Sequence, residues 1–225
     1  MISSKENAWF KRIRLATREH ADEIAIEGDK NIQDAIAAGW KPIATPEFAP
    51  RLLKSLTDTK AIALFARPRW NVDDLFKSKI VIALDAVQDP GNVGTIVRLA
   101  AAFDAAGVIL LPGCADAYGP KAIRASAGAI LSVPIVEMTI DALLARGVPI
   151  FAADMQGSSD LPHGVLVLGN EGQGVSERLR QNPVAIQTSG RIESLNVAAA
   201  AAILLWRTFN ERQAPDRRDP ARKPR

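Results

Sequence analysis

Residues 79–98, KIVIALDAVQDPGNVGTIVR, join an unbroken apolar run to a loop rich in Gly and Asn and then to a helical pattern. An apolar run without polar alternation is typical of a parallel strand that helices cover on both faces. Further runs of this kind follow along the chain, with helices between most of them: 107–111, 133–138, 148–154, 164–169 and 184–188. The pattern predicts a doubly wound α/β domain.

The residues before 79 show the same alternation on a smaller scale. Helical patterns are expected at 4–18, 29–39 and, more weakly, 46–56. Strands are expected at 22–28, 41–45 and 61–68, and a short polar connection follows at 69–78. A small α/β unit is therefore predicted ahead of the larger domain.

Composition limits the function classes. The chain has 225 residues, 48% of them apolar, with one cysteine, Cys114, and two histidines. These numbers suit one large or two small domains and argue against a disulfide, a Cys-rich zinc site or a His-based metal centre, so no metal is expected. No run reaches the ~20 apolar residues of a membrane span, and charges fill the first twenty residues where a signal peptide would need an apolar run. We expect a cytoplasmic protein without membrane contact.

The net charge of +3 is distributed unevenly. Residues 1–20 hold five Lys or Arg against two acids, and residues 211–225 hold six against three. Basic ends on a near-neutral body suggest contact with a polyanion. The alternative is a solvated helix face and a disordered tail, and for the tail, 213–225, disorder is the favoured interpretation.

Three loops that follow strands carry strong polar groups. Ligands of open α/β sheets bind at the carboxyl ends of the strands. The loops 88–98, 169–179 and 189–196 contribute Arg98, Glu171 and Asn196 among glycines that let backbone approach a ligand. Each loop alone is equally consistent with turn chemistry, but three at one sheet edge favour a ligand site. Neither a Walker A loop nor G-x-G-x-x-G is present, which disfavours nucleotide hydrolases and ordinary NAD enzymes.

The stretch RIESLNVAAAAAILLW, residues 191–206, leaves two interpretations open at this point. Ser194 and Asn196 precede an apolar helix. They could cap its free backbone N–H groups, or they could belong to a polar site.

The three loops resemble the motifs of a known family, the SpoU or TrmH-like RNA ribose methyltransferases of the knotted SPOUT class. DPGNVGTIVRLAAAF, VLVLGNEGQGVS and IESLNVAAAAAILLW resemble the family's first, second and third motifs in order and spacing. KENAWFKRIRLA and DEIAIEGDKNIQDAI resemble its small N-terminal domain, which is similar to the ribosomal L30e fold. The resemblance covers nearly the whole chain.

The resemblance implies a fold and a reaction. Residues 1–75 would form an L30e-like RNA-binding domain, and 79–212 a parallel-sheet methyltransferase domain with a trefoil knot in which 164–200 pass through an earlier loop. The protein would be a homodimer that transfers a methyl group from S-adenosylmethionine to a ribose 2′-hydroxyl of rRNA or tRNA. Its sulfonium already activates the methyl group, so no metal is required.

The resemblance also assigns residues. The reacting site would comprise Asn92, Arg98, Glu171, Ser194 and Asn196. The cofactor would be held by Gly169, Asn170, Gly172, Ile186 and Leu195. RNA would be contacted by Lys11, Arg12 and Arg14 and by Lys121, Arg124 and Ser126. With this match, the site interpretation of Asn196 is favoured over capping alone.

Arg98 keeps two possible roles. It is the family's candidate base, yet a free guanidinium stays protonated to about pH 12. It could instead bind the neighbouring phosphate, and Glu171 could orient it. Gln187 and Thr188, which replace the family's frequent Pro-Met, and Asp104, which stands where Gly is common, depart from the pattern. Two rival functions remain: a non-catalytic L30e-type RNA-binding protein and a different small-molecule α/β enzyme.

Overall fold

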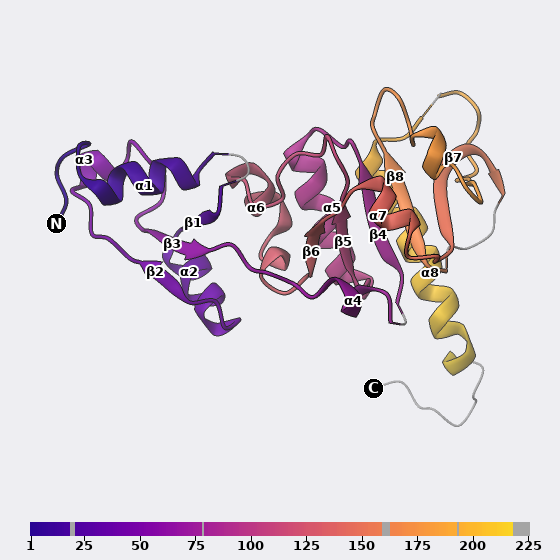
Figure 1. The fold of residues 1–225 in the computed structure, drawn as a ribbon, viewed down its shortest axis with the longest axis horizontal. Helices are drawn as coiled ribbons and strands as arrows, with labels where there is room; N and C mark the ends of the chain where they lie inside the picture. Colours follow the sequence, from indigo (N-terminus) through magenta and orange to yellow (C-terminus); the bar gives the residue numbers. More distant parts are fainter. Residues whose placement is uncertain (19–20, 78, 159–162, 193, 218–225) are drawn as a thin grey trace.

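The computed structural model describes residues 1–18, 21–77, 79–158, 163–192 and 194–217. Two units lie along the long axis of the molecule, the smaller one formed by the N-terminal residues (Figure 1). In the described ranges, no helix combines the length and apolarity that crossing a membrane requires.

The small unit is a three-stranded antiparallel sheet between helices. Its helices are α1 (Ala8–Ala16), α2 (Asp29–Ala37) and α3 (Pro50–Leu53), and its strands β1 (Glu23–Glu27), β2 (Pro42–Ala44) and β3 (Ile62–Ala66). The strand order is β1-β3-β2. Leu64 of β3 packs in the cluster that contains α1, whereas Phe65 packs in the cluster that contains α2. Alternate residues of the central strand thus serve opposite faces of the sheet.

The large unit contains a five-stranded parallel sheet in the order β6-β5-β4-β8-β7. Its strands are β4 (Val81–Asp85), β5 (Gly107–Leu110), β6 (Ile135–Glu137), β7 (Ile150–Ser158) and β8 (Val165–Gly169). Its helices are α4 (Val72–Leu75), α5 (Pro90–Ala102), α6 (Pro120–Ser126), α7 (Ile140–Leu144) and α8 (Val197–Arg217), with short 3-10 turns at Ala129–Leu131 and Glu177–Leu179. This confirms the predicted α/β class with a parallel sheet.

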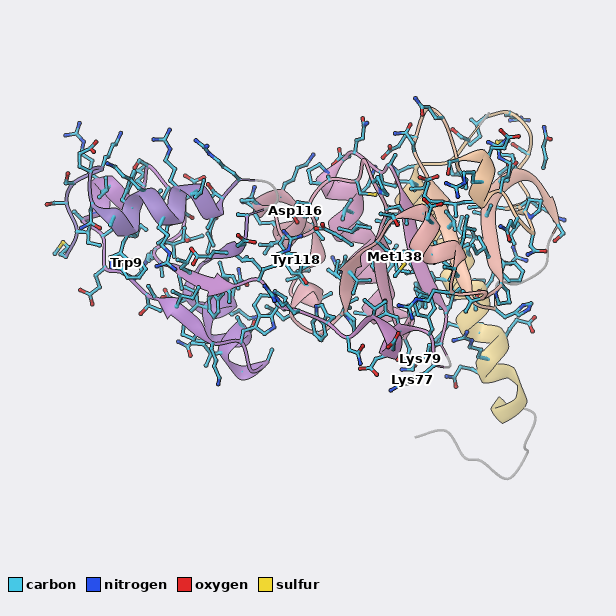
Figure 2. All side chains as sticks on the ribbon, in the orientation of Figure 1. Trp9, Lys77, Lys79, Asp116, Tyr118 and Met138 are labelled. Carbon is cyan, nitrogen blue, oxygen red and sulfur yellow. The ribbon has the colours of Figure 1, made fainter. Side chains whose placement is uncertain are left out.

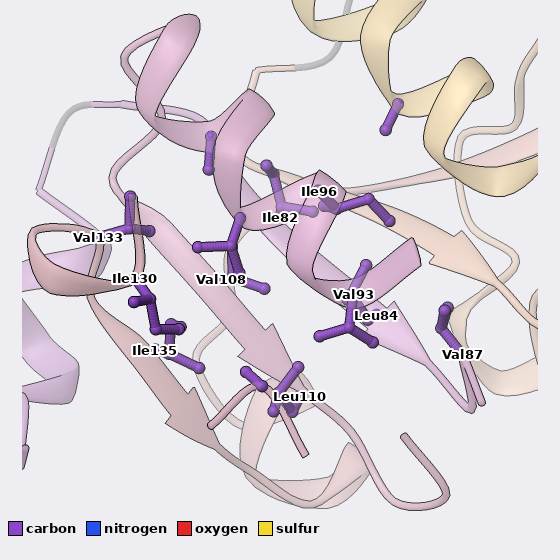
Figure 3. Packing of buried hydrophobic residues seen from close by; sticks show 14 of the residues in the cluster. Ile82, Leu84, Val87, Val93, Ile96, Val108, Leu110, Ile130, Val133 and Ile135 are labelled. Carbon is purple, nitrogen blue, oxygen red and sulfur yellow. The ribbon is translucent and has the colours of Figure 1, made fainter. Parts of the chain in front are cut away.

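The central strand β4 is buried on both faces. Ile82 and Leu84 pack against α5, as Figure 3 shows, whereas Val81 and Ala83 face the cluster on the other side of the sheet. The unbroken apolar run that predicted this strand is therefore explained by two covered faces. The direction of strand succession reverses between β4 and β8, which is where open α/β sheets form their ligand sites.

Several element boundaries differ from the prediction. Residues 184–188 form no strand: Val184 makes only isolated bridges to Ala153 and Ser158. Val184 is buried but Gln187 and Thr188 are exposed, so the segment lacks the continuous cover of a sheet strand.

The connection at 69–78 contains the short helix α4, whose first turn the side chain of Asn71 caps. The helix expected at 46–56 is limited to α3, and the strand expected at 148–154 continues to Ser158. Helix α8 runs to Arg217, so the first residues of the expected disordered tail, 213–225, are helical, and residues 218–225 lie outside the described ranges.

The two units meet at a polar and aromatic contact. Arg67 Nη2 lies 2.9 Å from Asp116 Oδ1 and 2.6 Å from Glu137 Oε1 of the large unit. Its guanidinium also lies over the ring of Tyr118, 4.8 Å from the centroid. Trp70 Nε1 donates to the Tyr118 hydroxyl at 3.2 Å, and Figure 2 shows Asp116 and Tyr118 at the junction. We refer to these residues as the Arg67 junction.

Candidate functional site

The three Gly- and Asn-rich loops converge at the carboxyl ends of β4 and β8. Asp89 follows β4 and caps α5 by accepting from Gly91 N, with Pro90 as the first helical residue. This cap fixes the start of α5 and places Asn92 in its first turn. A hydrogen bond from Lys121 Nζ, 2.9 Å from Asp89 Oδ1, lowers the pKa of Asp89 below its usual value.

Three of the predicted reacting residues form one hydrogen-bonded row. Asn92 Nδ2 donates to Glu171 Oε1 at 2.7 Å, and Asn196 Nδ2 donates to Asn92 Oδ1 at 3.2 Å. These partners are 79 and 104 positions apart in the sequence. We call Asn196, Asn92 and Glu171 the amide row. Because each amide oxygen is occupied, the row fixes which way both amides point.

Asn196 also caps α8. Its Oδ1 accepts from Ala198 N at 2.9 Å and from Ala199 N at 3.3 Å. The side chain therefore uses its oxygen for the helix and its nitrogen for Asn92. The sequence presented capping and a place in a polar cluster as alternatives, and in the structure the one side chain makes both contacts.

The loop after β8 folds tightly onto the strand end. Asn170 Nδ2 donates to Ala86 O at 2.9 Å, while its Oδ1 accepts from Gly172 N at 2.8 Å. A Cβ on Gly169 would lie 2.2 Å from the carbonyl carbon of Gly174, so no side chain fits there without a backbone shift. The buried carboxylate of Asp85 holds the far end of the loop by accepting from Ser176 N at 2.7 Å.

A cavity of about 490 Å³ opens beside this loop. Glu171 and Ser194 line the cavity. So do all the residues predicted to hold the cofactor, which are Gly169, Asn170, Gly172, Ile186 and Leu195. Much of its wall is apolar, with Leu168, Val184, Val197 and Leu204 contributing. The volume and lining match a small-molecule site, for which about 300–1,000 Å³ is usual.

Arg98 stands apart from the amide row. It is exposed on α5, and its side chain makes no hydrogen bond or ion pair with any residue that the structure describes. Glu171 accepts from Asn92 and not from Arg98, so the suggested orienting role of Glu171 is not seen. The guanidinium is thus available to a ligand from solvent.

The predicted RNA contacts occupy different surroundings. Lys11 and Arg12 are exposed on α1 and pair with Glu6 and Glu23, and Arg14 is exposed on the same helix. Arg124 Nη1 lies 3.8 Å from Glu27 Oε2 of the small unit. Ser126 is fully buried and donates to Ile123 O at 2.8 Å, so it is not on an RNA-accessible surface.

Sequence reasoning missed two charged residues of the cavity, Asp154 and Arg180. Asp154 follows the last ladder pair of β7, Ala152 with Val167. Its position at the end of an apolar strand was the signal that could have found it. Within the described part of the chain, no group of three or more His, Cys, Asp or Glu could hold a metal ion.

Sequence comparisons find proteins that are similar to this chain. Residues 79–206 match the family model described as the SpoU rRNA Methylase family. The chain is 36% identical over 147 residues to the Bacillus subtilis 23S rRNA (guanosine(2553)-2′-O)-methyltransferase RlmP, a match that covers 60% of this chain and 59% of that protein. It is 33% identical to the 23S rRNA (uridine(2479)-2′-O)-methyltransferase of Streptomyces viridochromogenes, with 87% and 85% covered.

A solved structure is also similar. The SpoU methyltransferase AviRb from Streptomyces viridochromogenes, in complex with the cofactor AdoMet, superposes with a TM-score of 0.80 at 26% identity. The superposition covers 92% of this chain and 98% of that chain, so both units take part in the likeness.

Proposed function

Because the chain belongs to the SpoU rRNA methylase family, we propose that it transfers a methyl group from S-adenosylmethionine to a ribose 2′-hydroxyl of RNA. The observation that carries the proposal is the amide row at the side of an apolar cavity. Both relatives described above act on 23S rRNA, which favours ribosomal RNA over tRNA as the substrate. Such a substrate would agree with the cytoplasmic location expected from the sequence.

The cavity fits S-adenosylmethionine in size and chemistry. Ile186 and Leu195 offer an apolar wall for the adenine, and the loop from Gly169 to Gly172 lines the cavity as well. When bound, the cofactor supplies a methyl group activated by a sulfonium. The residues proposed to hold it are Gly169, Asn170, Gly172, Ile186 and Leu195.

The amide row would position the ribose. A 2′-hydroxyl must lose its proton as the methyl group arrives, so acceptors and fixed donors are needed around it. Glu171 is an exposed acceptor held by Asn92, and Asn196 is held by the start of α8. We propose that these groups and Ser194 bind the reacting sugar in a preorganised arrangement.

We assign Arg98 to the phosphate next to the target ribose. Its guanidinium is exposed and has no carboxylate partner among the described residues. A free guanidinium can bind two phosphate oxygens at once and stays protonated at neutral pH. These properties favour phosphate binding over proton removal.

The predicted domain 1–75 comprises the small unit and α4, whose Leu75 packs on the large unit. It is proposed to be an L30e-like RNA-binding domain ahead of the methyltransferase domain, residues 79–212. Exposed Lys11, Arg12 and Arg14 on α1 support this role, because phosphate contacts supply much of the affinity for RNA. Helices α1 and α6 both lie in the upper half of Figure 1, as do the loops near β8. Lys121 and Arg124 of α6 would extend the contact toward the site.

A trefoil knot and a homodimer complete the proposal. The last strand, β8, is inserted between β4 and β7, and α8 packs back on α5, which suits threading of 164–200 through an earlier loop. Helix α8 buries Leu204 and Leu205 but leaves Trp206 54% exposed. An exposed Trp on an apolar helix suits a face that a second copy covers.

The test uses ribosomal RNA from a strain that lacks this gene and S-adenosylmethionine with a labelled methyl group. A 2′-O-methylated nucleotide cannot support alkaline cleavage of its own phosphodiester, so one position should resist alkali. Labelled RNA that carries a methylated base and is cleaved normally at every position would refute the ribose assignment.

A further inference from the structure

Asp154 and Arg180 form a charged pair at one side of the cavity. Asp154 Oδ2 lies 3.6 Å from Arg180 Nε, and the Asp154 side chain is only 26% exposed. Arg180 Nη2 donates to Val175 O at 2.9 Å, which holds the guanidinium against the loop after β8. The function proposed above assigns no role to this pair.

We propose that Asp154 accepts hydrogen bonds from the ribose hydroxyls of S-adenosylmethionine and makes the protein selective for a cofactor with an intact ribose. This inference rests on the proposed function. It assigns Asp154 to binding and not to the methyl transfer.

The carboxylate has acceptor capacity to spare. Asp154 Oδ1 accepts from Gln156 N at 3.0 Å, which fixes the orientation of the side chain. The 3.6 Å separation from Arg180 is longer than a hydrogen bond, so Oδ2 keeps its lone pairs for another donor. A carboxylate offers about four acceptor positions, and two neighbouring hydroxyls can use two of them.

The position of Asp154 in the sheet points to the non-reacting part of the cofactor. The strand order places β8 between β4 and β7. The amide row lies on the β4 side of β8 through Asn92, whereas Asp154 follows the paired part of β7 on the other side. Acidic residues near strand carboxyl ends accept from ribose hydroxyls in other α/β nucleotide sites.

S-adenosylmethionine offers two kinds of hydrogen-bond donor, the ammonium group of its methionine part and the hydroxyls of its ribose. The charge of Arg180 favours one of them at Asp154. An ammonium group at Asp154 would lie beside the guanidinium of Arg180, and like charges repel. Neutral hydroxyls meet no such repulsion. The pair therefore favours the ribose over the amino group of the methionine part.

The experiment is calorimetric binding of S-adenosylhomocysteine and of its 2′,3′-dideoxyribose analogue to the full-length chain and to Asp154→Asn. The native chain should bind the dideoxy analogue about 10- to 100-fold more weakly, as expected for lost charge-assisted hydrogen bonds. Asp154→Asn should bind the parent ligand correspondingly more weakly and discriminate little between the two ligands. Asp141→Asn is the matched control, because Asp141 also pairs with an arginine, Arg178, but lies outside the cavity.

Each outcome decides between the proposals. Equal binding of the two ligands by the native chain overturns the inference without any variant, so a folding defect in Asp154→Asn cannot hide the result. Native discrimination that persists in Asp154→Asn also overturns it. No binding of either ligand by the native chain would refute the proposed cofactor itself, and the inference with it.

Discussion

Two substitutions separate the two contacts of Asn196, the cap of α8 and the hydrogen bond to Asn92. Asn196→Ala removes both the cap of α8 and the hydrogen bond to Asn92. Asn196→Asp keeps an oxygen that can accept from Ala198 N and Ala199 N. It removes the Nδ2 group from which Asn92 Oδ1 accepts a hydrogen bond. The Asn92 amide would then turn its nitrogen toward the new carboxylate and stop donating to Glu171.

The expected magnitudes differ between stability and activity. Loss of an N-cap costs about 1 kcal/mol, which for a chain of this size lowers the melting temperature by roughly 2–4 °C. Asn196→Ala should show this loss, whereas Asn196→Asp should stay within about 0.5 kcal/mol of the parent because an anion suits a helix N-terminus. Both variants should lose about 10- to 100-fold in kcat/KM, corresponding to one or two lost hydrogen bonds in the amide row.

The assay pairs thermal unfolding with methyl transfer to ribosomal RNA, normalised to folded protein. Asn71→Ala serves as the matched control, since Asn71 caps α4 through Asp73 N away from the site. It should lose stability and keep its turnover. Parental turnover in Asn196→Asp would refute the functional reading of the amide row, and unchanged stability in Asn196→Ala would refute the capping argument.

Three further predictions concern single residues. Arg98→Ala should lower turnover at least 100-fold and leave S-adenosylhomocysteine affinity within a fewfold by calorimetry, because Arg98 is assigned to RNA phosphate. Burial raises the pKa of Tyr118, the chain's one tyrosine, to about 12, so phenolate absorbance should appear near pH 12 in the folded chain and near pH 10 after unfolding. Arg67→Met should cost about 1.5–3 kcal/mol in denaturant unfolding by removing the guanidinium that donates to the carboxylate of Asp116, 2% exposed, whereas the exposed neighbour Arg69→Met should cost under about 0.5 kcal/mol.

The outcomes against these predictions are specific. Near-normal turnover of Arg98→Ala at saturating RNA would remove Arg98 from the site. The raised pKa of Tyr118 means that both states are protonated below about pH 10, and stability then falls as the pH rises from about 10 to 12. A phenolate midpoint near 10 in the folded chain would contradict the burial of this ring. Equal costs for the two arginine variants would contradict a specific role for the Arg67 junction.

The parallel sheet was predictable because its strands are buried on both faces. Runs such as Val81–Asp85 and Val165–Gly169 contain no alternation and so report two-sided burial directly. The strand prediction for 184–188 was wrong because the segment resembles such a run, although only Val184 of it is buried. Two-sided cover depends on neighbouring segments, and local composition does not encode it.

Arg98 is not part of the amide row in the structure, and Asn92 entered the candidate site only through the resemblance to the family. The meeting of Glu171 and Asn196 was foreseen from the rule that strand ends share one edge. Their connectivity was not, because which atom of an amide faces which partner depends on distances between loops far apart in the chain. The same reason explains why the sequence could not show that Asn196 both caps α8 and donates to Asn92. Asp154 was missed because the strand prediction ended on it, and its relation to Arg180 exists only in three dimensions.

The Arg67 junction limits how freely the two halves of this chain could be exchanged with those of other proteins. Arg67 comes from the small unit, but Asp116 and Glu137 come from the large one. A chimaera that carries a foreign N-terminal half without an equivalent guanidinium would lose the hydrogen bonds that Arg67 donates to the buried carboxylate of Asp116. Exchanging the N-terminal half for that of another protein would therefore require transferring the arginine with it, or replacing its carboxylate partners by neutral side chains.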